Sequence, residues 1–204
     1  MRICLIGDIS GNLDEGMKNT TFHLHRELSK RHQILVIKPR QALFPYTIKK
    51  VRTFRPDVIH YVHGSSIRSF MVTQLCAKFC QGAKTIISMM HPNLSDFSER
   101  FARLLVPDLF LVQSSISEKY FSNMGVPVRF LPNGVDLERF VPVSVSDKNA
   151  LRRKYNLPEN DFIALHIGPL RRTRNLETLI QVQRKVNVQI VIAGSTTVKR
   201  DDAL

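Results

Sequence analysis

Short apolar runs rich in β-branched residues alternate with longer amphipathic stretches along the first 140 residues of this chain. Such runs are typical of strands buried on both faces, and the stretches between them have the period of helices. This alternation predicts a Rossmann-like, doubly wound α/β fold with a parallel sheet. The expected strands span residues 2–6, 34–37, 57–63, 85–89, 109–112 and 128–131, and the expected helices span 17–28, 46–54, 66–81, 97–106 and 115–125.

Residues 130–142 begin as a strand and end as a linker. Pro132 removes a backbone donor and so ends the strand. Asn133 and Gly134 both tolerate positive φ and therefore predict a turn. The chain is polar after Pro142, as at a domain boundary. The sequence thus predicts two domains, residues 1–142 and residues 143–204.

The second of these predicted domains is short. Its pattern predicts helices at 148–155 and 176–186 and strands at 162–167 and 188–193. Two strands and two helices do not close a Rossmann-like domain, because parallel strands need neighbours that bury both faces. We therefore expect an incomplete second α/β domain, either the truncated start of a larger one or a piece that a partner chain completes.

Glycine spacing argues against a dinucleotide site after the first strand. The glycines stand at positions 7, 11 and 16, which is not the G-x-G-x-x-G pattern, and the second strand ends in Lys38-Pro39-Arg40 without an acidic residue. No NAD-type cofactor is expected.

No apolar run approaches the roughly 18 residues that would span a bilayer, and the N-terminus lacks a signal-peptide pattern. We expect a cytoplasmic protein. The three cysteines are too few and too isolated for a disulfide framework or a metal site. Cys76 and Cys80, four residues apart on an expected helix, are interpreted as core residues, as is Cys4.

The net charge of +13 is spread along the chain, with 19 basic and 11 acidic residues up to Val143. Anionic lipid, phosphorylated substrates or nucleic acid could each explain such an excess, and so could a surface that is charged only for solubility. Nucleic acid ranks last because no nucleic-acid-binding motif is present.

Several motifs occur in the order found in one enzyme family. They are Asp57-Val58-Ile59-His60, His91 at the end of a strand, Pro132-Asn133-Gly134-Val135-Asp136, and Ile167-Gly168-Pro169-Leu170. Together they resemble retaining glycosyltransferases of the GT-B fold, of the family 4 type. The resemblance covers most of the chain, as a GT-B N-terminal domain followed by the start of the C-terminal domain.

The resemblance implies a set of site residues. His91 would be catalytic, beside the donor sugar, and Gly16 would lie in the loop where acceptor and donor sugar meet. Gly168, Arg171 and Arg174 would bind the donor diphosphate, and Asn133, Gly134 and Asp136 would form the interdomain hinge. Pro169 stands where the family has an arginine, which weakens the donor site. For His60 and His63, the alternative to a functional role is a structural one, in which both are polar groups at the end of the sheet whose hydrogen bonds are satisfied within the protein.

The implied reaction is metal-independent transfer of a sugar from a nucleotide-diphosphate sugar to a glycan or lipid-linked acceptor, without a cofactor. The family's later donor-gripping residues lie beyond Leu204, so little or no activity is expected from this chain alone. The alternative is a non-catalytic GT-B-like binding module that needs a partner chain.

The expected helix at 46–54 is basic on one side and apolar on the other. Ile48, Val51 and Phe54 recur three residues apart, with Lys49, Lys50 and Arg52 between them. This pattern is typical of a segment that lies at an anionic membrane surface, which would place the protein peripherally at the cytoplasmic face. In the alternative, the apolar side packs on the sheet and only the charges are exposed.

Overall fold

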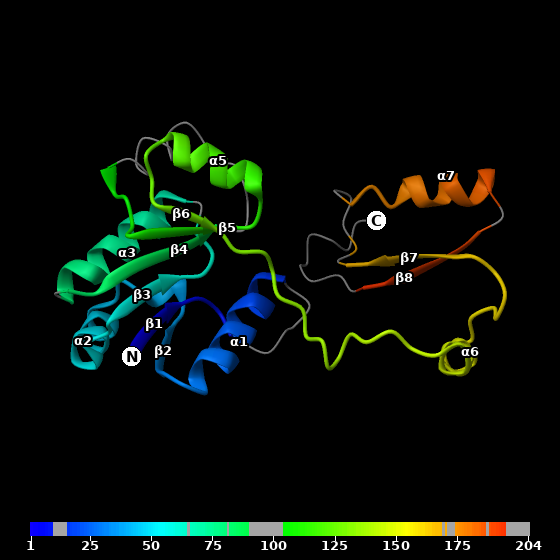
Figure 1. Cartoon of the computed structure of the whole chain (residues 1–204), viewed down its shortest axis with the longest axis horizontal. Helices are drawn as coiled ribbons and strands as arrows, with labels where there is room; N and C mark the ends of the chain where they lie inside the picture. The colour runs from blue at the N-terminus through cyan, green and yellow to red at the C-terminus, as the bar shows by residue number, and fades with distance from the viewer. Residues whose placement is uncertain are drawn as a thin grey trace. The chain divides into compact units, whose positions relative to one another are not determined.

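The computed structural model describes residues 1–9, 16–64, 66–80, 82–89, 104–168, 170, 174–186 and 188–194, and of Met17 the backbone alone. The chain divides into two compact units, Met1–Gly134 and Val135–Leu204 (Figure 1). The domain boundary expected after Pro142 stays a prediction.

Unit 1 is built on a six-stranded parallel sheet with the order β2-β1-β3-β4-β5-β6. The predicted doubly wound, Rossmann-like α/β fold is thereby confirmed. The strands are β1 (Arg2–Ile6), β2 (Gln33–Ile37), β3 (Val58–Tyr61), β4 (Lys84–Met89), β5 (Leu109–Val112) and β6 (Val128–Phe130). The helices are α1 (Gly16–Ser29), the 3₁₀ turn η1 (Pro39–Gln41), α2 (Pro45–Phe54), α3 (Ile67–Phe79) and α5 (Ser115–Asn123).

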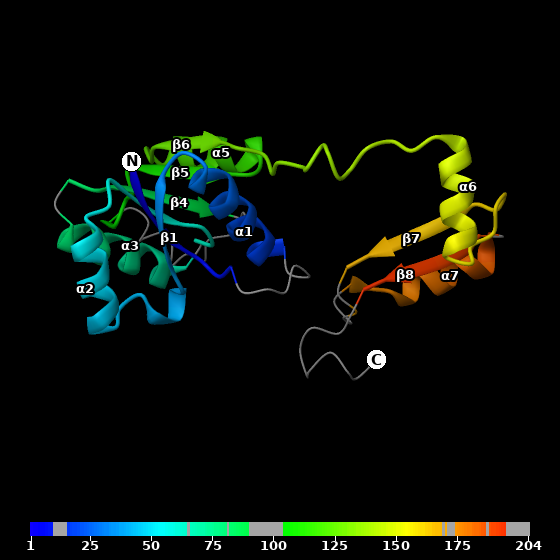
Figure 2. The same cartoon turned by 90° about the horizontal axis from the view of Figure 1, so that it is seen from below.

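Helices cover the sheet from both sides, and β1 lies between α1 and the pair α2 and α3 in both views (Figures 1 and 2). The larger core cluster joins alternate strand residues to α2, α3 and α5, with Phe70, Phe110 and Phe121 fully buried. The smaller one joins Ile3 and Leu5 to α1. Alternate side chains of one strand thus enter two different cores, which is why the strands are apolar at nearly every position.

The apolar side of α2 packs into the larger core. Val51 is only 1% exposed and Thr47 is buried, whereas Lys49, Lys50 and Arg52 are exposed. The arrangement is therefore the one in which the helix packs on the sheet and presents its charges to solvent. Insertion of the Val51 side into a membrane interface, the other reading of the sequence, is wrong because that side is occupied by the protein's own core.

Serine side chains cap two helices of unit 1, and a glycine follows one of them. The Ser66 side chain accepts a hydrogen bond from the Ser69 backbone N–H and forms a capping box with it, and Ser114 accepts from the Ser117 N–H. Gly125 follows α5 with φ of +73°, a conformation that favours glycine. The expected helix at 97–106 lies largely outside the described residues.

Unit 2 contains α6 (Val145–Lys154), β7 (Ile163–Ile167), α7 (Glu177–Lys185) and β8 (Gln189–Ala193), and the two strands pair in parallel. This confirms a small second parallel α/β sheet. Its apolar residues are largely exposed, including Leu165, Ile167, Ile180 and Ile192.

None of the described helices is both long and apolar enough to cross a membrane. All three cysteines are buried free thiols, as their interpretation as core residues predicts.

Candidate functional site

The order of the strands predicts that a ligand binds at the carboxyl ends of β1 and β3. The chain passes from β1 outward to β2 and then returns to the other side of β1 to form β3. Where strand order reverses in this way, the crossovers diverge and leave a crevice outside the carboxyl ends of the two strands. Here those ends carry Gly7 and Asp8 after β1, and Val62 and His63 after β3.

Helix α1 approaches this edge closely because Gly7 has no side chain. A Cβ at position 7 would lie 2.6 Å from Cγ2 of Thr21. Thr21 itself is fully buried. The Gly7 backbone N–H donates to the Ile37 carbonyl at 2.9 Å, which holds the strand end in the sheet. Glycine is therefore required here by a close helix–strand contact.

His63 is joined to Thr21 across 42 residues of sequence. Its Nε2 lies 2.8 Å from Thr21 Oγ1, a hydrogen bond whose direction depends on the tautomer. Its Nδ1 is buried and has no hydrogen-bond partner within the described part of the chain. Burial lowers the pKa of His63, against smaller opposing effects of the Val62 backbone and Asp8.

His60 makes the second imidazole contact at the same end of the sheet. Its Nε2 lies 2.7 Å from Oγ of Ser88 on β4. Burial, and to a smaller extent the His63 imidazole, lowers the pKa of His60 to about 4. His60 is therefore neutral at pH 7, and it serves as a hydrogen-bonding group and not as a cation.

Thr21, His60, His63 and Ser88 form what we call the switch-point cluster. It offers neutral ring nitrogens and hydroxyl groups but no paired carboxylates, so its chemistry suits hydrogen bonds to polar, uncharged groups such as hydroxyls. Among the described residues, the buried Nδ1 of His63 has no hydrogen-bond partner and is the atom most in need of one. The alternative for the two histidines, that they are satisfied polar groups, holds for Nε2 of both rings and, within the described part of the chain, does not hold for His63 Nδ1.

The residues predicted for the acceptor side are placed as follows. Gly16 is the exposed first residue of α1, nothing lies within 4 Å of a Cβ built on it, and its carbonyl accepts from the Thr20 hydroxyl at 3.0 Å. His91 lies outside the described residues.

The predicted donor-phosphate residues belong to unit 2. Gly168 follows β7 with φ of +150°, and its N–H donates to the Ala193 carbonyl at 3.0 Å. Arg174 is exposed and precedes α7 in the chain. Arg171 lies outside the described residues.

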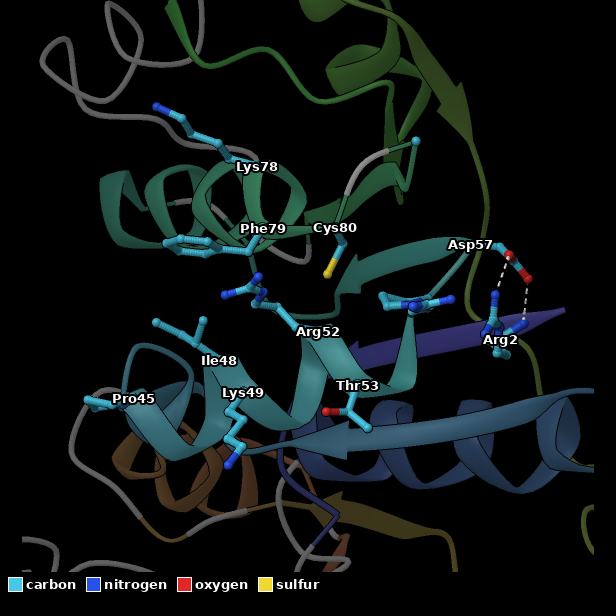
Figure 3. Close-up of a pocket in the computed structure, with 13 residues that line it drawn as sticks. Arg2, Pro45, Ile48, Lys49, Arg52, Thr53, Asp57, Lys78, Phe79 and Cys80 are labelled. Atoms are coloured by element: carbon cyan, nitrogen blue, oxygen red, sulfur yellow. Dashed lines mark hydrogen bonds and ion pairs between the residues drawn. The ribbon is translucent and has the colours of Figure 1, made fainter.

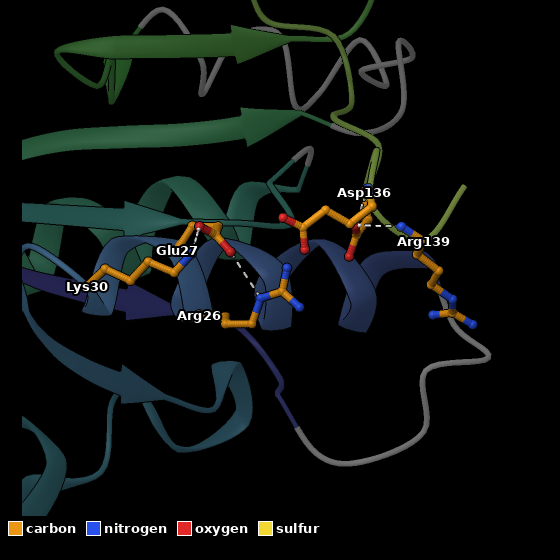
Figure 4. Close-up of polar contacts among 6 residues, drawn as sticks. Arg26, Glu27, Lys30, Asp136 and Arg139 are labelled. Carbon is orange, nitrogen blue, oxygen red and sulfur yellow. Dashed lines mark hydrogen bonds and ion pairs between the residues drawn. The ribbon is translucent and has the colours of Figure 1, made fainter. Parts of the chain in front are cut away.

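The predicted hinge is held in place at Asn133. The side-chain amides of Asn133 and Gln113 exchange two hydrogen bonds, of 2.6 and 3.2 Å. Neither Asn133 nor Gly134 has positive φ, so the turn expected there is wrong. The turn lies further on, where the Asp136 carboxylate accepts from the backbone N–H groups of Glu138 and Arg139, both at 3.1 Å (Figure 4).

Sequence reasoning missed Gly7, Thr21 and Ser88 as site residues. Thr21 lies in α1 and Ser88 lies in β4. The hydrophobic patterns of these two segments indicate which side chains are buried, but not which ones lie at a site. The available signal was topological: the residues directly after β1 and β3 of a doubly wound sheet flank its switch point.

Among the described residues, no group of three or more His, Cys, Asp or Glu side chains is arranged to hold a metal ion.

Comparison with known proteins supports the architecture. The structure is similar to the crystal structure of a glycosyltransferase from Rickettsia africae ESF-5, with a TM-score of 0.55 and 13% sequence identity, over 94% of this chain and 68% of that chain. No protein-family model matches this chain. No curated protein matches it either. At this identity the likeness shows the fold alone, a Rossmann-like parallel α/β sheet consistent with a GT-B domain.

Proposed function

We propose that this chain is a glycosyltransferase of the GT-B class, or the acceptor-side part of one, and transfers a sugar from a nucleotide-diphosphate sugar to a glycan or lipid-linked acceptor. The observation that carries the proposal is the switch-point cluster. It places neutral hydrogen-bonding groups at the end of the sheet where doubly wound folds bind ligands, and one of them has a buried atom without a partner among the described residues. The likeness to a glycosyltransferase structure adds support at the level of the fold.

On the acceptor side, sugar hydroxyls are the natural partners of the cluster. In this proposal His63 Nδ1 hydrogen-bonds a hydroxyl of a bound sugar, while Thr21 holds the ring through Nε2. Gly16, which has no described atom within 4 Å of a Cβ built on it, would let a sugar approach the start of α1. His91 would be the catalytic residue beside the donor sugar, as the family resemblance implies.

On the donor side, Gly168, Arg171 and Arg174 would bind the diphosphate. Arginine binds phosphate in a bidentate manner, and a helix N-terminus favours the negative charge. Pro169, in place of the family's arginine, carries no charge and no N–H. The proposal therefore includes weak donor binding and low activity of this chain alone. Asn133, Gly134 and Asp136 would form the hinge between the two domains, and the reaction would need no metal.

The experiment is titration of the purified chain with nucleoside-diphosphate sugars and, separately, with acceptor glycans, followed by an assay of donor hydrolysis and transfer. Arg174→Ala should weaken sugar-nucleotide binding by about tenfold, the loss of one hydrogen bond to a charged group, and His63→Ala should weaken acceptor binding by about tenfold, the loss of one hydrogen bond to a desolvated group. The matched control is His32→Ala, since the buried Nδ1 of His32 also lacks a partner among the described residues but lies outside the switch point. Equal behaviour of His63→Ala and the control would remove His63 from the site.

The alternative function is a non-catalytic GT-B-like module completed by a partner chain. The exposed apolar residues of unit 2 favour it, because a parallel sheet is ordinarily covered on both faces. Light scattering after size exclusion separates the two functions. A stable monomer that binds nucleotide-sugar supports the transferase, whereas an oligomer or a complex without nucleotide-sugar binding supports the module.

Peripheral attachment at the cytoplasmic face of a membrane belongs to the same proposal, because a lipid-linked acceptor is presented there. The charges that could support it lie on α2, on the exposed side of the helix.

A further inference from the structure

A broad groove opens between α2 and the end of α3, at the edge of the sheet where β1 and β3 begin (Figure 3). Its volume is about 1600 Å³. The side chains that argue for a ligand are its five cations, from Arg2, Lys49, Arg52, Arg55 and Lys78. We call it the α2–α3 groove. It lies where the strands begin, whereas the switch-point cluster lies at their carboxyl ends.

The α2–α3 groove carries a large excess of positive charge. Its one acidic residue, Asp57, is already engaged by Arg2, whose backbone N–H and guanidinium lie 2.7 and 3.8 Å from the two carboxylate oxygens. Five cations against one anion leave a formal excess of four charges. The C-terminal ends of α2 and α3 together contribute about one negative charge. The negative ends of these helices therefore offset only about one of the four excess positive charges.

Within the described ranges, Lys49, Arg52, Arg55 and Lys78 form no salt bridge and no side-chain hydrogen bond. From Leu28 to Ser95, Asp57 is the only acidic residue, against eleven lysines and arginines. Like charges this close repel one another, and an anion in the groove would relieve that repulsion.

Arg55 adds an argument from the backbone. It ends α2 in the left-handed conformation, with φ of +48°, and its N–H donates to the Val51 carbonyl at 3.0 Å. This position is ordinarily glycine or asparagine, and a bulky residue there carries a strain of about 1 kcal/mol. Arg55 thus lines the groove in a backbone conformation that has a cost in stability, as is typical of functional positions.

Apolar groups lie beside the charges. Ile48 and Phe79 line the α2–α3 groove (Figure 3), and Phe79 is exposed. Tyr46 and Lys50 line an adjoining hollow that shares Lys49 and Arg2 with it. The exposed Tyr46 ring makes an edge contact with Phe44, at 5.8 Å between centroids. A ligand would thus meet cations and aromatic faces together, the combination found where proteins contact phosphate headgroups.

We propose that the α2–α3 groove is a second binding site, for phosphate-bearing ligands, with Arg52, Arg55 and Lys78 as its principal contacts. The phosphate could be carried by the headgroup of an anionic lipid or be a free oligophosphate, since both present the same chemistry to the guanidinium groups. The site is independent of the proposed sugar transfer. His60 of the switch-point cluster and Asp57 of the groove are three residues apart along β3, which separates their Cα atoms by about 10 Å.

The test compares three forms of the full chain. The groove variant is Arg52→Ala/Arg55→Gly/Lys78→Ala, in which glycine suits the left-handed position. The control variant, Lys119→Ala/Arg129→Ala/Lys148→Ala, removes the same charge from exposed cations outside the groove. Binding is measured to phosphatidylglycerol vesicles, to phosphatidylcholine vesicles and to inorganic pyrophosphate, at about 0.05 M and about 0.5 M salt. Thermal unfolding of each form verifies that it is folded.

We expect the wild-type chain to bind phosphatidylglycerol vesicles or pyrophosphate at low salt, and the groove variant to bind about a hundredfold more weakly, about fivefold for each cation removed. The control variant should stay within about threefold of wild type. Binding to vesicles alone identifies a lipid headgroup, and binding to pyrophosphate identifies a free phosphate. The proposal is wrong if the wild type binds neither probe, if phosphatidylcholine is bound equally well, or if the two variants lose the same affinity.

Discussion

Asp108 and Thr85 hold the starts of two neighbouring strands together by reciprocal hydrogen bonds. Oδ2 of Asp108 accepts from the Thr85 backbone N–H and hydroxyl, both at 2.8 Å, and the Asp108 N–H donates to Thr85 Oγ1 at 2.9 Å. Oδ1 of Asp108 also accepts from Lys84 Nζ at 2.8 Å. The backbone N–H groups of Thr85 and Asp108, at the starts of β4 and β5, are thereby both satisfied by side chains.

The same arrangement occurs at the other pair of strands. Asp57 stands before β3 as Asp108 stands before β5, each after a proline, and its carboxylate accepts from the Arg2 N–H at the start of β1. The Pro-Asp pairs in this sequence thus have a structural role, to fix strand starts. The Asp57-Val58-Ile59-His60 motif resembles a glycosyltransferase motif, and the structure gives its two end residues different roles. Asp57 fixes the start of a strand, and His60 belongs to the switch-point cluster.

We predict that Asp108→Ala and Thr85→Val each lower the free energy of unfolding by about 1–2 kcal/mol, since each leaves hydrogen-bonding groups without partners. The double variant should cost clearly less than the two single changes together, because both remove the same contact. Urea unfolding of the four forms measures this. Strict additivity would show that the two residues act separately.

The pKa of Asp108 predicts loss of stability in acid. The Lys84 ammonium, together with the two donors of Thr85, lowers the pKa of Asp108 to about 2. A carboxyl group whose pKa is depressed in the folded state stabilises the fold above its unfolded pKa, near 4, and loses this contribution as the pH falls toward 2. Its side chain is 39% exposed, so solvent screening keeps the effect small. Asp108→Ala should show a shallower decline of stability between about pH 4 and pH 2.

His60 predicts a second pH dependence, at higher pH. Its pKa is lowered to about 4 by burial, whereas the unfolded chain has a histidine pKa near 6.5. Between these values the unfolded state binds more protons, so stability is complete above pH 6.5 and declines as the pH falls toward 4. Replacement by a residue that does not titrate, His60→Gln, should flatten the curve in this window and leave the Asp108 window unchanged. An unaltered slope between pH 6.5 and 4 would contradict the assignment.

Asn133, which we propose as part of the interdomain hinge, gives a prediction about motion. Because its amide is paired with Gln113, the chain is fixed to unit 1 up to this residue. Asn133→Ala should change the free energy of unfolding by about 1 kcal/mol or less, since the pair is exposed. It should nevertheless speed proteolytic cleavage between residues 130 and 142. Gln113→Ala should behave alike, and an unchanged cleavage rate in both variants would show that the amide pair does not restrain the hinge.

Sequence patterns predicted nearly every described strand and helix, because the β-branched runs of unit 1 are buried on both faces and several helices begin at a capping serine. Contacts between distant residues could not be predicted in this way. Thr21 meets His63, and Gln113 meets Asn133, only through the folded sheet. The turn expected at Asn133-Gly134 failed for the same reason: local propensity allowed positive φ, but a pairing twenty residues away holds the chain extended.

Gly64 provides the last prediction. It follows β3, and its N–H donates to the Ser88 carbonyl at 2.9 Å, so the backbone of this loop lies directly against β4. A Cβ at position 64 would lie 2.1 Å from Cγ2 of Ile87, a fully buried side chain that cannot move away. Gly64→Ala should therefore lower the free energy of unfolding by about 1–3 kcal/mol, the range for overpacking in a core. Ile87→Leu removes the Cγ2 methyl, so the double variant should recover part of that loss. Gly16→Ala is the matched control for stability, since no atom lies within 4 Å of its Cβ and alanine favours a helix. A Gly64→Ala variant as stable as wild type, or no recovery in the double variant, would show that this loop can shift and that His63 beside it is less firmly placed than the structure indicates.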